Sequence, residues 1–257
     1  MTKRDHPAAR AQRGPRIAGI LEGHFGSPVK PRRRSSPLDA LIATLLSQNT
    51  NDQNSYRAWL SLRKRFPTWE KLASAPWQAV AASIKVGGLK NQKALRIKKI
   101  LRSIHGETGK YDLGFLNDRS NDEVMEYLLS MKGVGKKTAA CVLVFSLGRD
   151  VFPVDTHIHR ICNRLGLVRT NSADQTYDEM KVLVPKGRSY SFHVNLIRFG
   201  RETCKAGKPL CGTCPLFDEC MVPVAQRLAA GTNIVRGVSN KRRDFLITEQ
   251  IVRDRAG

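Results

Sequence analysis

The stretch Met131-Lys-Gly-Val-Gly-Lys-Lys-Thr138 joins two segments of helical periodicity through a turn of glycine, valine and glycine. Two glycines in so short a turn allow positive φ and a close backbone approach to a ligand. We expect the second helix over residues 136–147, so the turn meets the positive end of its dipole, where unpaired N–H groups can bind a phosphate. The stretch therefore predicts a hairpin between two helices. Its candidate DNA-binding residues are Gly133, Val134, Gly135 and Lys136.

Two side chains near this hairpin have the chemistry of a catalytic site. Lys137 falls in the first turn of the second helix, where nearby positive charge disfavours the ammonium and so favours a nucleophilic amine. Asp155 follows Pro153 and precedes Thr156-His-Ile-His-Arg160. Alone, a lysine in a first helical turn is usually solvated surface, and an aspartate before a helix is usually its N-cap. The two residues gain weight as catalytic candidates only when they are taken together.

A second signal lies near the C-terminus, where four cysteines are separated by six, two and five residues: Cys204, Cys211, Cys214 and Cys220. In a reducing compartment such a group indicates a metal or redox site rather than disulfides. The spacing alone leaves open both a tetrahedral zinc ion and an iron–sulfur cluster. The loop between the first two cysteines carries Lys205 and Lys208, which can contact phosphates.

The charge of the chain favours a polyanionic partner. Forty-four Lys and Arg against 22 Asp and Glu give a formal net charge of +22, and the isoelectric point is near 10.3. Nucleic acid is favoured over membrane, because the longest apolar run, residues 139–147, is far shorter than the roughly 18 residues of a spanning helix. The N-terminus also lacks the apolar centre of a signal peptide. We therefore expect an intracellular protein that binds DNA.

The hairpin stretch, followed by Val154-Asp-Thr-His-Ile-His-Arg160 and the cysteine spacing, resembles the signatures of the endonuclease III family of helix-hairpin-helix DNA glycosylases. The resemblance extends from about Pro37 to Cys220. It implies that the four cysteines bind a [4Fe-4S] cluster whose role is chiefly structural. It also implies an all-α fold of two helical domains, with DNA across both domains and the damaged base in the cleft between them.

The domain organisation combines this resemblance with the periodicity of the chain. No convincing run of period-two alternation occurs, so helices should predominate, among them residues 37–47, 56–66 and 71–84. We expect a disordered basic N-terminus over residues 1–14 and, over residues 15–35, a helix and linker that pack on the cluster domain. A six-helix domain with the hairpin should cover residues 36–150, the cluster domain residues 151–223, and a basic extension residues 224–257.

Two short segments of the six-helix domain match family positions that enter the DNA. In the polar loop after Leu46, the family places an amide side chain that fills the gap left by the flipped nucleotide. Asn49 has that position by ungapped register, but Gln48 precedes it and relatives typically use glutamine, so both amides are candidates. Leu89 matches an apolar wedge that enters the base stack. The helix after it has six basic residues that suit a DNA-facing surface: Lys90, Lys93, Arg96, Lys98, Lys99 and Arg102.

The resemblance and the residues together predict a bifunctional DNA glycosylase and AP lyase of base excision repair, acting on damaged, oxidised pyrimidines. Lys137 would attack C1′ of the flipped nucleotide and form a Schiff base, while Asp155 would stabilise positive charge on the sugar. The partner would be double-stranded DNA with damaged bases or abasic sites, bound by a monomer. One alternative is a monofunctional glycosylase for mismatched thymine, uracil or another altered base. Another is a non-catalytic DNA-binding protein, which would need neither Lys137 nor Asp155.

Overall fold

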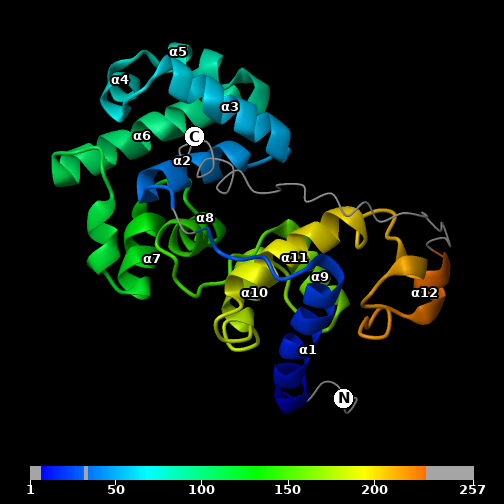
Figure 1. Ribbon diagram of the computed structural model, residues 1–257. Helices are drawn as coiled ribbons and strands as arrows, with labels where there is room; N and C mark the ends of the chain where they lie inside the picture. The colour runs from blue at the N-terminus through cyan, green and yellow to red at the C-terminus, as the bar shows by residue number, and fades with distance from the viewer. Residues whose placement is uncertain (1–6, 32–33, 230–257) are drawn as a thin grey trace. The chain divides into compact units, whose positions relative to one another are not determined.

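The computed structural model describes residues 7–31 and 34–229, and this part of the chain contains helices and turns but no strand (Figure 1). The all-α prediction is therefore confirmed. The chain divides into two compact units. In the described part, one unit contains residues 31 and 34–149, and the other contains residues 7–30 and 150–229. No helix within the described ranges is both long enough and apolar enough to span a membrane.

The first unit is built around α2 (Pro37–Ser47), which is buried from Pro37 to Leu46. Ser36 caps this helix by accepting a hydrogen bond from the Asp39 amide at 3.2 Å. Helices α3 (Asp52–Arg65), α6 (Lys90–Thr108) and α8 (Lys136–Cys141) pack against α2. The remaining elements of this unit are α4 (Trp69–Ser74), α5 (Trp77–Ser83), η2 (Lys85–Gly87), η3 (Gly114–Asp118), α7 (Asn121–Ser130) and η4 (Val142–Ser146).

Two predicted helices of this unit are divided. The helix expected over residues 71–84 is two helices, because Pro76 lacks an N–H and holds Ala75 in an extended conformation, with ψ at 150°. The helix expected over residues 136–147 is α-helical only to Cys141 and then continues as the π-helix η4. Between the divided helices, α6 extends to Thr108 and the short helix η3 follows it.

The π-helix is held at its end by the segment that precedes α2. The Leu147 amide donates to the carbonyl of Val142, five residues back, at 3.1 Å. Ser146 Oγ donates to the Ser35 carbonyl at 2.7 Å, and Arg34 Nη1 donates to the Leu147 carbonyl at 3.1 Å. Arg34 lies in the linker expected over residues 15–35, and its guanidinium binds the last turn of the hairpin's second helix.

The second unit is built around the largely buried helix α11 (Ser189–Glu202), against which α1 (Pro7–Phe25) and α9 (Thr156–Arg164) pack. Its other elements are α10 (Ala173–Met180), η5 (Cys211–Thr213) and α12 (Val224–Ala229). The start of α1 corrects the prediction for residues 1–14, because residues 7–14 are helical and only residues 1–6 lie outside the described range. The basic extension expected over residues 224–257 is described only as far as α12, and residues 230–257 lie outside it.

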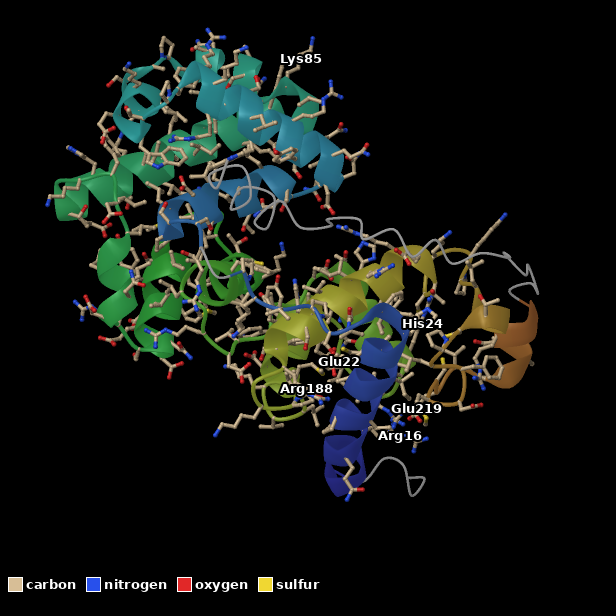
Figure 2. The ribbon with its side chains drawn as sticks, in the orientation of Figure 1. Arg16, Glu22, His24, Lys85, Arg188 and Glu219 are labelled. Atoms are coloured by element: carbon tan, nitrogen blue, oxygen red, sulfur yellow. The ribbon has the colours of Figure 1, made fainter. Side chains whose placement is uncertain are left out.

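Polar contacts fasten α1 to this unit (Figure 2). Arg13, only 9% exposed, donates from Nη2 to the carbonyls of Leu165 and Glu219, each at 2.7 Å. The Glu219 carboxylate also accepts Arg16 Nη2 at 2.5 Å. These contacts explain why the helix continues N-terminal to Pro15, which would otherwise destabilise it by about 3 kcal/mol.

Candidate nucleic-acid interface and metal centre

The hairpin turn between α7 and α8 contains two glycines in different environments. Gly133 has φ of +92°, and a Cβ on it would lie 2.2 Å from Arg96 Nε. Gly135 is the N-cap of α8 with φ of −102°, and a Cβ there would meet no atom within 4 Å. The first glycine is therefore required by the fold, whereas the second leaves an open backbone at the start of the helix. Lys136 and Lys137 occupy the first turn of α8 and are both half-buried.

The loop after α2 is joined to this hairpin by Gln48. Its Oε1 accepts a hydrogen bond from Arg96 Nη1 at 2.9 Å, and its Nε2 donates to Thr138 Oγ1 at 3.3 Å. Thr138 is buried directly after Lys137. Both ends of the Gln48 amide are therefore used inside the protein, while the neighbouring Asn49 is exposed.

Asn49 and Leu89 share a rare backbone conformation. Their φ angles are +52° and +47°, and within the described ranges they are the only residues other than glycine with positive φ. Leu89 is 46% exposed and directly precedes α6. A left-handed conformation is unfavourable for a leucine, and strained residues of this kind concentrate at functional sites. The family resemblance predicts that Leu89 and either Gln48 or Asn49 enter DNA, and the structure gives Asn49 and Leu89 an exposed side chain on a strained backbone.

The sequence suggested that the six basic residues of α6 face DNA. Three of them instead bind other parts of the protein. Lys93 is 3% exposed and donates from Nζ to the carbonyls of Leu46 and Gly87, each at 2.8 Å. Lys98 binds the carbonyls of Ala73 and Ala75 at the end of α4, and Arg96 binds Gln48. The exposed basic residues of this helix are Lys90, Lys99 and Arg102.

The role of Lys93 was missed, although the sequence contained a signal for it. Lys93 lies in register with Ile97, Ile100 and Ile104, which form the buried face of α6. A lysine on the apolar stripe of a helix must find hydrogen-bond acceptors inside the protein, because an unpaired buried ammonium is strongly unfavourable. Burial, and after it the charge of Arg96, lowers the pKa of Lys93 to about 8.

Asp155 lies in the other unit from Lys137, at the start of α9. Its Oδ1 accepts the Ile158 amide at 2.8 Å, so it is the N-cap of this helix. One bond of this kind leaves the second carboxylate oxygen able to accept further hydrogen bonds. Near it, burial lowers the pKa of His157, and the negative charge of Asp155 opposes this effect.

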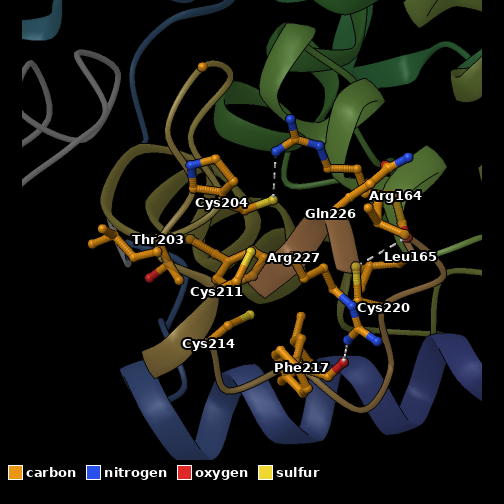
Figure 3. A pocket seen from close by; sticks show the side chains of 16 residues that line it. Arg164, Leu165, Thr203, Cys204, Cys211, Cys214, Phe217, Cys220, Gln226 and Arg227 are labelled. Atoms are coloured by element: carbon orange, nitrogen blue, oxygen red, sulfur yellow. Dashed lines mark hydrogen bonds between the residues drawn. The ribbon is translucent and has the colours of Figure 1, made fainter. Parts of the chain in front are cut away.

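The four cysteines of the second unit line one cavity of about 230 Å³ (Figure 3). Burial is the main cause that raises the pKa of Cys214 to about 12, with smaller contributions from the other three thiols. Within the described ranges no three His, Cys, Asp or Glu side chains converge as they do around a single metal ion. Four thiols that line one cavity are a ligand set that an iron–sulfur cluster can use.

Comparison with known families agrees with this geometry. Residues 42–186 match the family described as HhH-GPD superfamily base excision DNA repair protein. Residues 204–220, from the first to the last of the four cysteines, match the iron-sulfur binding domain of endonuclease III. The chain belongs to the endonuclease III family. It is therefore a base excision repair enzyme of the DNA glycosylase/AP lyase class, and its four cysteines are the ligands expected for a [4Fe-4S] cluster.

Individual relatives of this endonuclease III family member cover most of the described chain. The endonuclease III of Thermotoga maritima is 36% identical over 188 residues, which are 73% of this chain and 84% of the relative. An Arabidopsis thaliana relative is 39% identical over 173 residues, but the match spans only 59% of its length. Two solved structures of endonuclease III with DNA, one non-covalent and one a trapped covalent intermediate, each match with a TM-score of 0.70, 27% identity, and coverage of 82% of this chain and 95% of theirs.

In this endonuclease III family member, cationic side chains surround the cysteine cavity. Arg164 Nη1 donates to Cys204 Sγ at 3.4 Å and to the Lys205 carbonyl at 2.8 Å. The guanidinium of Arg227 lies 4.2 Å from the centre of the Phe217 ring. These cations complement thiolates, which are the form of cysteine that binds metal. The two Arg164 contacts fix the start of the loop on which Lys205 and Lys208 are exposed.

Proposed function

We propose that this chain removes damaged, oxidised pyrimidines from duplex DNA and cleaves the resulting abasic site through a Schiff base on Lys137. The observation that carries the proposal is the position of Lys137 in the first turn of α8, directly after the Gly-Val-Gly turn of a helix-hairpin-helix. One of the matched structures is endonuclease III trapped covalently on DNA, and a covalent intermediate is what this chemistry requires.

The proposed reaction uses two groups of this chain. The neutral amine of Lys137 forms a bond to C1′ of the flipped nucleotide, and the electrons of the glycosidic bond leave with the base. The aminated sugar opens to a Schiff base, and loss of a C2′ proton then expels the 3′ phosphate by β-elimination. The carboxylate of Asp155 stabilises the positive charge that develops on the sugar and helps to remove the proton of the attacking amine.

Asn49, rather than Gln48, is the residue proposed to fill the gap in the stack. The Gln48 amide already binds Arg96 and Thr138, and withdrawing it would leave these partners without their hydrogen bonds. Asn49 is exposed on a strained backbone. Its amide offers two donors and one acceptor to the orphaned base. Leu89 is the proposed wedge, since it is a partly exposed apolar side chain at a second strained position.

Contacts with phosphates should hold the duplex. The proposed contacts are the backbone of the turn formed by Gly133, Val134 and Gly135, the side chain of Lys136, and the exposed loop with Lys205 and Lys208. The net charge of +22 supports binding that is driven mainly by release of counterions. The matched structures of endonuclease III with DNA support this class of partner.

Trapping with borohydride tests the nucleophile. Reduction of the Schiff base should leave a covalent complex between the wild-type protein and a duplex with an abasic site or an oxidised pyrimidine. Lys137→Gln removes the amine and keeps most of the side chain, so trapping and strand cleavage should be lost while DNA binding remains.

The matched control is Lys136→Gln, which removes the neighbouring amine in the same helical turn. This variant should weaken binding and preserve trapping. Trapping at the wild-type level in Lys137→Gln would assign the nucleophile to another residue, with Lys136 the first candidate. If the wild type is never trapped but still releases bases, the monofunctional mechanism, in which Asp155 activates water, replaces the proposal.

A further inference from the structure

The two segments proposed to enter DNA are bound by one buried side chain. Lys93 Nζ donates to the carbonyl of Leu46, three residues before Asn49, and to the carbonyl of Gly87, two residues before Leu89. The backbone amide of Lys93 also donates to the Leu89 carbonyl at 2.9 Å. A single residue of α6 therefore holds the backbone of both segments, and all of these atoms lie in the same unit.

These contacts are stronger than an ordinary surface lysine would make. The side chain is 3% exposed, so solvent scarcely competes for the ammonium. Hydrogen bonds to a charged group are roughly twice as strong as those between neutral groups. Both acceptors are main-chain carbonyls, so the bonds fix backbone positions rather than flexible side-chain tips.

The strained conformations of Asn49 and Leu89 explain why such a restraint is useful. A residue other than glycine with positive φ relaxes unless the surrounding structure holds it in place. The segments also approach each other directly, since a Cβ on Gly88 would lie 4.0 Å from the Asn49 carbonyl oxygen. Displacement of either segment would therefore change the distance between the gap-filling amide and the apolar wedge.

We propose that Lys93 is a positioning residue that fixes the Asn49 segment and the Leu89 segment as one rigid pair, so that both side chains enter the base stack together. The inference rests on the proposed function of those two side chains. It assigns to Lys93 a role in opening the duplex and no role in bond breaking. The pKa of about 8, lowered by burial and by the charge of Arg96, agrees with an ammonium enclosed by protein.

The chain offers a matched control for testing this role. Lys93→Met removes the ammonium and keeps the length of the side chain. Lys98→Met makes the same change on the same helix, where the lysine also binds two main-chain carbonyls, those of Ala73 and Ala75 at the end of α4. Both variants lose a similar pair of hydrogen bonds, but only Lys93→Met releases the DNA-probing segments.

Single-turnover base release should separate duplex opening from chemistry. On a duplex with a paired oxidised pyrimidine, Lys93→Met should be slower than the wild type by roughly tenfold or more, because the stack must be opened before the base can be released. On the same lesion in an unpaired bulge, its rate should approach that of the wild type. Lys98→Met should match the wild type on both duplexes.

A double substitution tests whether the wedge depends on the lysine. Leu89→Ala should slow release from the paired lesion in the wild-type background and have a much smaller effect in the Lys93→Met background, because a displaced wedge contributes little. Additive effects would refute the positioning role. Equal losses by Lys93→Met on paired and bulged lesions, or the same losses in Lys98→Met, would also refute it.

Two further measurements cover the cases in which Lys93→Met does not fold or the wild type releases no base. If Lys93→Met does not fold, Lys93→Gln, which retains donor hydrogens, should also be slowed more on the paired than on the bulged lesion, by a smaller factor than expected for Lys93→Met. If the wild type releases no base from either duplex, the proposed function fails, and 2-aminopurine fluorescence beside an abasic site then reports duplex opening directly. A fluorescence rise that is equal in Lys93→Met and the wild type would overturn the role of Lys93.

Discussion

Substituting the two hairpin glycines one at a time should separate folding from DNA contact. In Gly133→Ala, the new methyl group would lie 2.2 Å from Arg96 Nε, so the guanidinium must move away and lose its 2.9 Å bond to Gln48. In Gly135→Ala, the methyl group meets nothing within 4 Å, and φ is −102°, which alanine adopts readily. Both substitutions add one methyl group to the same turn, but only Gly133→Ala should displace Arg96.

The expected loss of stability in Gly133→Ala follows from these contacts. Holding alanine at positive φ costs about 1–2 kcal/mol, and a hydrogen bond to a charged group contributes about 1.5–3 kcal/mol. Because Arg96 is half-buried, we take the lower end of both ranges, which gives about 2.5 kcal/mol. For a protein of this size that corresponds to a decrease in Tm of roughly 5–10 °C, measured by circular dichroism. Gly135→Ala should keep the wild-type Tm.

Gly135→Ala should weaken DNA binding although it leaves the stability of the protein unchanged. If a phosphate approaches the open backbone at the start of α8, the methyl group should weaken binding to duplex DNA and make the log–log salt slope shallower by about 0.9 for one lost contact. Fluorescence anisotropy across a salt series measures both quantities. Unchanged affinity and slope would show that the turn does not contact phosphate, and an unchanged Tm in Gly133→Ala would refute the account of Arg96.

Three further outcomes are expected. The protein should be isolated brown with iron and sulfide, and Cys214→Ser should lower the iron content measured by elemental analysis; stoichiometric zinc without iron would contradict this expectation. Replacing Lys205 and Lys208 together with glutamine should make the salt slope of DNA binding shallower by up to roughly two units, and no change would show that their loop lies away from the duplex. Because burial lowers the pKa of Lys93 from 10.5 to about 8, the unfolded chain binds more protons than the folded chain between these pH values. The free energy of unfolding of the wild type, relative to Lys93→Met in urea titrations, should therefore rise as the pH increases from 8 towards 10.5.

The parts of the fold that the sequence predicted are those with strong periodicity. Leu38, Leu41 and Leu45 repeat at helical spacing, and α2 is buried as expected. The prediction of one helix over residues 71–84 was wrong, because apolar periodicity was given more weight than Pro76. The π-helix was not predictable, because its contacts come from more than a hundred residues earlier: Arg34 donates to the Leu147 carbonyl, and the Ser35 carbonyl accepts the Ser146 hydroxyl.

The site was predictable where a motif defined it and not where packing did. The hairpin and the four cysteines were recognised from spacing, and the geometry of each is consistent with that reading. The choice between Gln48 and Asn49 depended on side-chain contacts with Arg96 and Thr138, which no local pattern encodes. Counting basic residues along α6 could not show that Lys93 is directed inward, because a charge count does not state which face of the helix is buried.

The bond between Arg13 and the Glu219 carbonyl has a consequence for biosynthesis, because it joins residues 206 positions apart. At about 5–20 residues per second, a ribosome needs roughly 10–40 s to make the intervening chain. During that interval α1 lacks the surface that covers Ile17 and Leu21, which are fully buried in the finished protein. The hairpin unit is nearly continuous in sequence and can fold as it emerges. The cluster-bearing unit must wait for its last segment, so the apolar face of α1 is accessible to chaperones for tens of seconds during synthesis.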